Sequence, residues 1–162
     1  MALISNIGAG IFTKLKYKAD ATYTLPTDDS THVTFVAGDF STATEITGIR
    51  EFPTFGKPAN IVNVPQYGQG ISSQISGQSD APTLEFSLNY IPGTHNTLQG
   101  LVGDGNSYVF MLDVKNTTTG DNAAFYVKGQ VASFEVTPSL TDSNQATLTL
   151  TTSTDYVGPF AD

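Results

Sequence analysis

The chain of 162 residues contains no cysteine and few charged side chains. The absence of cysteine excludes a disulfide framework and a thiolate metal site, and it fits a reducing compartment or a particle assembled inside one. Charged residues make up only 14% of the chain, against about a quarter of an average globular domain. Because charges on an exposed strand normally discourage other chains from pairing with it, their scarcity favours strand-to-strand assembly.

Basic residues are the scarcer sign of charge. Seven Lys and Arg stand against fifteen Asp and Glu, which gives a formal net charge of −8. A protein that grips nucleic acid through its phosphates needs the opposite balance, so the composition argues against that function. No apolar run approaches bilayer length, and the N-terminus lacks the pattern of a secretion signal, so we expect no membrane contact. The length predicts a single domain over residues 1–162.

Motifs for chemistry are also missing. The sequence has no glycine-rich phosphate loop and no His-x-x-x-His pair, and its two histidines, His32 and His95, are far apart. A lone histidine without a nucleophile motif is usually structural. Asp104 lies in a Gly-Asp-Gly-Asn segment that lacks the further carboxylates of a calcium loop, which favours a tight turn. We therefore predict no enzyme, no catalytic residues, no cofactor and no metal site.

What the chain does have is threonine, 23 residues of it, and clear alternation. The strongest alternation runs from Thr83 to Tyr90, where one face is apolar and the other polar, as in a strand with one face buried and one wet. The apolar face consists of Leu84, Phe86, Leu88 and Tyr90, and the polar face of Thr83, Glu85, Ser87 and Asn89. Gln145–Thr154 alternates in the same way and predicts the last strand.

Two further strong strands, Ser107–Lys115 and Ala123–Thr137, predict an antiparallel hairpin. In the second of them the apolar face switches near Val131 and Ala132, which predicts a bulge that bends the strand from one sheet to another. After Ile91-Pro92-Gly93, Thr94 is expected to cap the one helix of the fold, which ends at Gly103. Weaker patterns predict three more strands, in Thr13–Tyr23, His32–Ala37 and Ala43–Phe55.

Other segments fit no regular core element. Residues 1–12 are expected to form an arm and residues 159–162 a short tail. Residues 54–82 are rich in Gly, Ser, Gln and Pro and predict a long loop or hairpin that orders on contact, because long loops in compact domains are usually functional. The side chains of Lys14, Lys16 and Lys18 share one strand face, which is either a solvated face or a patch that docks on an acidic neighbour.

The order of these elements resembles a known family. A strand ending in an aromatic residue is followed by Pro-Gly, a short helix, a hairpin and a threonine-rich strand. The segments that carry this order are Leu84–Gly93, Thr97–Leu101, Tyr108–Leu112 and Gly129–Glu135. Over residues 43–158 the layout resembles the tube-forming module of the tail tube proteins of long, non-contractile-tailed (siphovirus) bacteriophages. The resemblance implies a mainly β fold, a β-sandwich or partial-barrel module with one short flanking α-helix and a long inter-ring loop.

The resemblance also implies a function. Such subunits assemble as hexameric rings that stack into a hollow tube, through which double-stranded DNA passes to the host. The partners would be further copies of the chain, a tape-measure protein and tail-tip or terminator proteins, in a virion assembled in the bacterial cytoplasm. Because barrels of about 16 to 18 strands enclose only a modest channel, a duplex-wide lumen needs strands from several subunits.

The alternation of side chains along each strand then assigns residues to surfaces of such a tube. If Leu84, Phe86 and Leu88 face the core, the polar side chains that alternate with them face the lumen. Such an acidic and polar lumen would repel the phosphates of DNA, so that the duplex slides. The expected lumen-facing residues are Thr83, Glu85, Ser87, Asn89, Ser133, Glu135, Thr147 and Thr149. The expected inter-ring contacts are Phe55, Lys57, Ile61, Val64, Tyr67, Ile71 and Ile75.

Two alternatives remain open at this stage. One is another self-assembling virion or secretion-tube subunit with the same sandwich and a different symmetry. The other is a carbohydrate-binding β-sandwich, which would need exposed aromatic residues on a concave face. The candidates for that face are Tyr17, Tyr23, Tyr67 and Tyr108.

Overall fold

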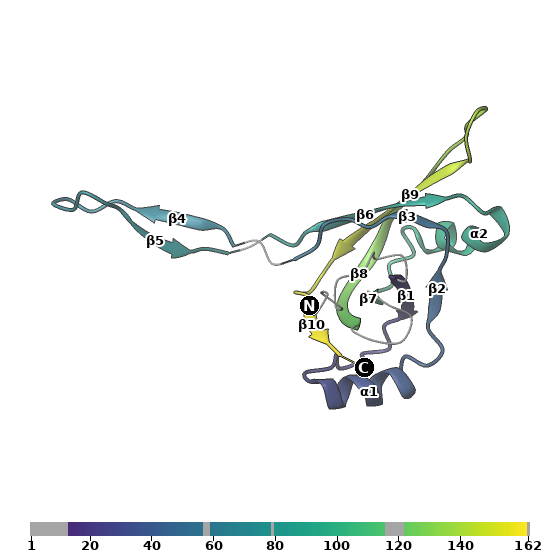
Figure 1. The fold of residues 1–162 in the computed structure, drawn as a ribbon, viewed down its shortest axis with the longest axis horizontal. Coiled ribbons are helices and arrows are strands. Elements are labelled where there is room, and N and C mark those ends of the chain that lie inside the picture. Colours follow the sequence, from purple (N-terminus) through teal and green to yellow (C-terminus); the bar gives the residue numbers. More distant parts are fainter. Residues whose placement is uncertain (1–12, 57–58, 79, 116–121, 162) are drawn as a thin grey trace, which may run out of the picture.

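The computed structural model describes residues 13–56, 59–78, 80–115 and 122–161. The fold is mainly β, as expected: a curled, antiparallel half-barrel sheet with two short helices (Figure 1). The strand order of the large sheet is β2-β1-β7-β8-β9-β6-β3, with β10 paired to β8, while β4 and β5 form a separate two-stranded sheet. The strands are β1 (Lys14–Ala19), β2 (Thr44–Ile46), β3 (Ile49–Glu51), β4 (Ile61–Val64), β5 (Ser73–Ser76), β6 (Thr83–Asn89), β7 (Tyr108–Lys115), β8 (Asn122–Thr137), β9 (Gln145–Thr152) and β10 (Val157–Phe160).

Strand β8 divides the large sheet into two halves. Its residues Asn122–Gly129 pair with β7, and its residues Gly129–Thr137 pair with β9. The register with β9 shifts between Val131 and Ser133, so Ala132 has no partner and the predicted bulge is confirmed. We call β2, β1, β7 and the start of β8 the first half-sheet, and the end of β8, β9, β6 and β3 the second half-sheet.

The main core lies between the two half-sheets. It joins Leu15, Phe110 and Leu112 of the first half-sheet to the apolar faces of β6 and β9 in the second. Its most deeply buried members on those two strands are Leu84, Phe86, Leu88, Leu148 and Leu150. Burial of such side chains is the dominant favourable term in folding, so this core fixes how the two half-sheets face each other.

A second core lies on the opposite face of the first half-sheet, beneath helix α1 (Asp29–Ala37). Here Val109 and Met111 of β7 pack with the rings of Phe35, Tyr126 and Phe160. Strand β7 is therefore buried on both faces, which explains its continuous apolar sequence.

Helix α1 replaces the strand expected at His32–Ala37, and it makes two helices where one was expected. The reason is capping: the side chain of Asp28 accepts the N–H of Thr31 at 2.7 Å, while the Thr31 hydroxyl accepts the N–H of Asp28 at 3.1 Å. This reciprocal pair satisfies donors that a helix start leaves free. It overrides the strand preference of the β-branched residues that follow.

Three further expectations need correction. Helix α2 spans Pro92–Leu101 and has Ile91, not Thr94, at its N-cap, because Pro92 suits the first helical position. The expected strand at 43–55 is split into the short strands β2 and β3. The expected tail from Pro159 begins inside β10, which pairs with β8 and buries Phe160 in the second core.

Candidate assembly surfaces

The outer face of the second half-sheet brings the predicted polar residues together. Glu85 of β6 lies opposite Thr149 of β9, which in turn lies opposite Ser133 of β8. The next row consists of Ser87, Thr147 and Glu135. Neighbouring strands are about 4.8 Å apart, so these rows form one continuous surface. We call this surface the polar face, and it also carries Thr83 and Asn89, both exposed.

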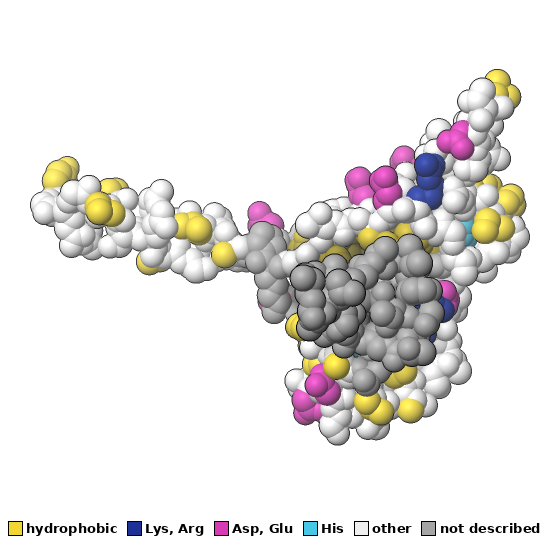
Figure 2. Space-filling model, in the orientation of Figure 1, with side chains coloured by type: hydrophobic (Ala, Val, Ile, Leu, Met, Phe, Trp, Pro, Cys, Tyr) yellow, Lys and Arg dark blue, Asp and Glu magenta, His cyan; other side chains and the backbone are white. Residues whose placement is uncertain are grey.

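The structure adds one acidic residue that parity along the sequence did not identify. Glu51 of β3 lies opposite Ser87, so it belongs to the polar face beside Glu85 and Glu135. The side of the sheet on which Glu51 lies could not be inferred from the sequence, because the register of β3 shifts between Ile49 and Glu51. This β-bulge breaks the alternation. Acidic side chains gather along this upper face of the molecule, next to a smaller basic area (Figure 2).

The second half-sheet has two open edges among the described residues. On one side, the end of β8 beyond Gly129 pairs with β9 alone. On the other side, β6 pairs with β3 only through Ser87 and Leu88, so its start from Thr83 to Phe86 has β9 as its single neighbour. Open edges offer unpaired N–H and C=O groups to another chain.

The long stretch expected at 54–82 forms a hairpin, β4–β5, that extends far from the rest of the molecule (Figure 1). Of the residues expected to contact another ring, Ile61, Tyr67, Ile71 and Ile75 are exposed on it and Val64 is half-buried. Phe55 instead packs inside its own chain, with its ring 5.1 Å from that of Phe125. Lys57 lies outside the described residues.

Two of the three lysines of the expected docking patch have partners in their own chain. Lys14 forms an ion pair with Glu45 at 3.0 Å. Lys18 donates to the carbonyl oxygen of Asp39, and its ammonium lies 5.3 Å from the centre of the Tyr23 ring. Lys16 is half-buried between them on the same face. Their role in docking stays a prediction.

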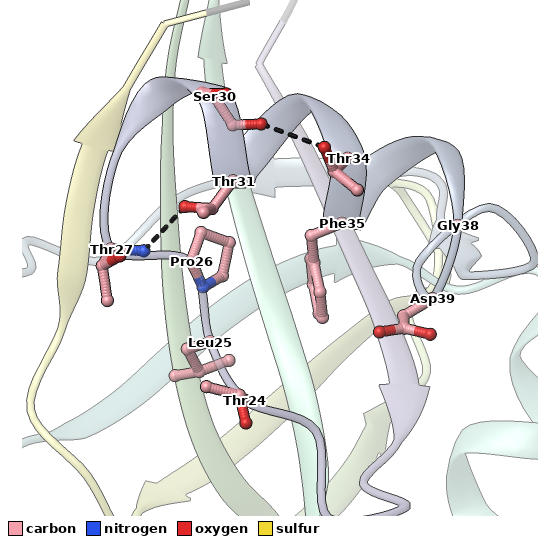
Figure 3. A pocket seen from close by; sticks show the side chains of 10 residues that line it. All are labelled: Thr24, Leu25, Pro26, Thr27, Ser30, Thr31, Thr34, Phe35, Gly38 and Asp39. Atoms are coloured by element: carbon pink, nitrogen blue, oxygen red, sulfur yellow. Dashed lines mark hydrogen bonds between the residues drawn. The ribbon is translucent and has the colours of Figure 1, made fainter.

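A cavity of about 430 Å³ lies between α1 and the segment Thr24–Thr27 (Figure 3). Two of its hydroxyls are used within the chain: Thr31 accepts the N–H of Thr27 at 3.1 Å, and Thr34 donates to the carbonyl of Ser30 at 3.2 Å. Asp39 is the one ionisable side chain in its lining. The residues that line the cavity include no histidine, lysine or arginine that could act beside this carboxylate in acid–base chemistry.

Both histidines are buried and hydrogen-bonded. His95 accepts the N–H of Ile91 on Nδ1 at 3.1 Å, and its Nε2 lies 2.9 Å from the carbonyl oxygen of Thr47, so Nε2 carries the proton. The ring of His32 bonds the hydroxyl of Tyr126 at 2.9 Å. Within the described part of the chain, no group of three His, Asp or Glu side chains is placed to hold a metal.

The loop around Asp104 forms a hydrogen-bonded turn. Asp104 accepts the N–H of Asn106 at 2.9 Å, which closes the tight turn expected there. The pKa of the Asp104 carboxyl is lowered, mainly by the hydrogen bond that Tyr108 donates and then by the bond from the N–H of Asn106. In the described residues, no helix has the length and apolar character needed to cross a bilayer.

The aromatic residues considered for carbohydrate binding do not share a surface. Tyr108 is buried in the main core, and Tyr17 packs against it with ring centres 6.1 Å apart. Tyr23 packs against the second core, while Tyr67 lies fully exposed on the hairpin. No concave aromatic face therefore supports that alternative in the described residues.

Comparison with known proteins gives a match to a solved structure. No protein-family model matches the sequence, and no curated protein matches it either. The fold is similar to that of a chain in the cryo-EM structure of the anti-feeding prophage (AFP) baseplate, 6-fold symmetrised, with a TM-score of 0.54 and 10% sequence identity. The match covers 96% of this chain and 94% of that chain. At this identity the likeness concerns the fold.

Proposed function

We propose that this chain is a structural subunit of the tube of a phage tail or a tail-like particle, and that it assembles as hexameric rings that stack into a hollow conduit. The observation that carries the proposal is the fold match, because it covers nearly the whole length of both chains and the matched chain belongs to a 6-fold symmetric baseplate. Assignment to the tubes of long, non-contractile tails is the finer form of this proposal, and it rests on the order of elements in residues 43–158.

The open edges of the second half-sheet support ring formation. The end of β8 in one copy would pair with the open edge that β3 and the start of β6 form in the next copy, so that six copies of four strands close a barrel of twenty-four. Full closure removes every open edge. Barrels of about 16 to 18 strands leave an aqueous channel, so a larger one suits a duplex.

The polar face would then line the channel. Each copy contributes Glu51, Glu85 and Glu135 to this face among uncharged threonines and serines. A ring of such subunits repels DNA phosphates, so double-stranded DNA would pass without binding. The other partners of the chain would be a tape-measure protein and tail-tip or terminator proteins, in a particle assembled in the bacterial cytoplasm.

The test is electron microscopy of the purified chain at increasing concentration, with negative staining and class averages of end-on views. We expect six-fold rings and hollow tubes whose lumen is wide enough for a DNA duplex. A monomer that stays monomeric at every concentration, or solid filaments without a lumen, would contradict the proposal. Rings with another symmetry would instead favour a different virion or secretion-tube subunit.

A further inference from the structure

The cavity between α1 and the segment Thr24–Thr27, which we call the α1 cavity, is separate from the polar face. It lies beside the second core, on the side of the first half-sheet that faces away from the main core. Its volume of about 430 Å³ is within the range of roughly 300 to 1,000 Å³ that is usual for ligand pockets. The proposed ring contacts use the edges of the second half-sheet and leave this cavity open.

The lining of the α1 cavity combines an apolar centre with polar side chains around it. Leu25, Pro26 and Phe35 lie in the middle, and Asp39 lies to one side with a carboxylate oxygen directed toward Phe35 (Figure 3). Pro26 and Phe35 are mostly covered by their own chain, whereas Asp39 is exposed. An occupant would therefore meet apolar surface and a carboxylate at the same time.

Several polar groups of the lining are unused. The Asp39 carboxylate accepts no hydrogen bond and forms no ion pair within the described part of the chain, and Lys18 donates to the main-chain carbonyl of Asp39 instead. The hydroxyls of Thr24, Thr27 and Ser30 also have no partner among the described residues. Because a hydroxyl can both donate and accept, these three groups suit the N–H and C=O groups of a peptide backbone.

The charge around the α1 cavity is of one sign. Between Thr24 and Phe40 the chain has three Asp and no Lys or Arg. Asp28 accepts the N–H of Thr31 at the start of α1, and this bond lowers the pKa of its carboxyl, so that it stays ionised. Val33 on α1 is 53% exposed, and Figure 2 shows acidic and apolar side chains together on this part of the molecule. A segment that carries both positive charge and apolar side chains matches these features.

A second copy of this chain does not supply that segment. Of the described Lys and Arg side chains, only Arg50 is exposed and without a partner. It lies on β3, the edge strand of the second half-sheet. In the proposed ring the next copy covers this edge, whereas α1 lies on the outer side. The occupant is therefore a different protein.

We propose that the α1 cavity is the docking site for a short segment of another protein, in which an arginine pairs with Asp39. Both oxygens of this carboxylate are free, so they can accept two parallel N–H bonds from a guanidinium group. A guanidinium is also more weakly hydrated than an ammonium group, which suits the apolar centre of the cavity. The backbone of the segment bonds the free hydroxyls, and its apolar side chains cover Leu25 and Val33. The site stands on the cavity alone, and its position on the outside of a tube rests on the proposed function.

The experiment measures the binding of three end-blocked peptides, Leu-Arg-Leu, Leu-Lys-Leu and Leu-Gln-Leu, to the full chain by saturation-transfer NMR. This method detects weak binding to small and large particles, so it serves both the dissociated chain and assembled tubes. Two variants each remove one negative charge: Asp39→Asn in the α1 cavity, and Glu85→Gln on the polar face as the matched control. Both positions are exposed, and circular dichroism checks that both variants remain folded.

We expect the unaltered chain and Glu85→Gln to bind Leu-Arg-Leu equally, and Asp39→Asn to bind it about tenfold more weakly, because a hydrogen bond between charged groups is lost. Leu-Lys-Leu should bind more weakly than Leu-Arg-Leu, and Leu-Gln-Leu more weakly again. Equal losses in the two variants would indicate a general attraction to an acidic chain and would overturn the proposal. Equal affinities for the Arg and Lys peptides would overturn the assignment to arginine.

The two states of the chain separate this inference from the proposed function. We expect Leu-Arg-Leu to bind tubes and dissociated chain with the same affinity, because α1 lies outside. If the chain bound the peptide but formed no tubes, the docking site would stand and the proposed function would fail. If tubes formed and lost the binding that depends on Asp39, copies of the chain would cover the cavity, and the assignment to another protein would be wrong. Self-association that both Asp39→Asn and Arg50→Gln abolish would overturn that assignment too.

Discussion

Two buried tyrosines differ in how their hydroxyls are satisfied. Tyr108 donates to the carboxylate of Asp104. The hydroxyl of Tyr156 has no hydrogen-bond partner among the described residues, although the side chain is only 5% exposed. A buried hydroxyl without a partner lowers stability, since it has lost its bonds to water. The two residues therefore predict opposite effects of the same substitution.

We expect Tyr156→Phe to leave the free energy of unfolding at pH 7 unchanged or higher, and Tyr108→Phe to lower it. Burial raises the pKa of Tyr156 to about 12, above the value of about 10 for an unfolded chain. The stability that comes from this raised pKa is complete below pH ~10 and is lost as pH rises toward 12. Tyr156→Phe should flatten that alkaline loss.

Urea denaturation followed by circular dichroism at pH 7 and across pH 10 to 12 provides both readouts. A larger loss of stability at pH 7 from Tyr156→Phe than from Tyr108→Phe would contradict this account of the two hydroxyls.

At the scale of elements, β8 connects the two half-sheets, and the connection requires Gly129. This residue pairs with Tyr108 on one side and Thr152 on the other. A Cβ at this position would lie 2.1 Å from the carbonyl oxygen of Thr151, which is backbone and cannot rotate away. The strand can therefore pass from one half-sheet to the other only without a side chain here.

We expect Gly129→Ala to lower the free energy of unfolding by about 1 to 3 kcal/mol, the usual range for overpacking. The control is Gly100→Ala, because that glycine lies in α2 with open space around its Cβ position. Alanine is the better helix former, so the control should be neutral or more stable by up to about 1 kcal/mol. Equal effects of the two substitutions in urea denaturation would contradict the steric argument.

Alternation predicted some elements well because it reports burial directly. The polar and apolar faces of β6 follow the predicted parity, and the switch in β8 coincides with an unpaired Ala132. At β3 a bulge that no local pattern marks breaks the alternation, so the sequence did not identify Glu51 as part of the polar face. Helix α1 was missed for another reason: its only clear signal is the Asp28 and Thr31 cap, which precedes a run of β-branched residues.

Some features of the candidate surfaces could be inferred from the sequence, and others could not. Residues of the polar face could be named from sequence because strand period fixes their side. The contact of the β8–β9 turn with the chain around Tyr90 could not be inferred, since it joins segments that are far apart in the sequence. Phe55 was misplaced because a glycine- and proline-rich stretch gives no period from which its packing on Phe125 could be inferred.

At the scale of the whole molecule, the polar and apolar surfaces have separate places. The polar face covers one side of the second half-sheet, whereas the exposed apolar side chains of the β4–β5 hairpin lie at one end of the long axis. This separation suits a subunit that contacts its copies through its ends and edges and leaves one face to a channel. It also allows the charge of the channel to be changed without touching the contacts between copies.

Glu85→Lys tests that separation. The side chain is exposed in the middle of the polar face, so we expect the variant to fold and assemble as before. In a six-fold ring it would replace six negative charges by six positive ones. The channel would then attract phosphates instead of repelling them, and we expect the tubes to bind duplex DNA with an affinity that falls steeply as salt increases.

The matched control is Asp39→Lys, which makes the same change of charge beside α1, on the far side of the first half-sheet. Binding of fluorescent duplex DNA to sedimented assemblies, at several salt concentrations, gives the comparison. If Glu85 lines the channel, only duplexes with a free end should enter Glu85→Lys tubes, whereas closed circles should be excluded. Asp39→Lys tubes should retain linear and circular DNA equally, because their added charge lies outside. Equal retention of linear and circular DNA by Glu85→Lys tubes would place Glu85 on an outer surface and overturn the assignment of the polar face.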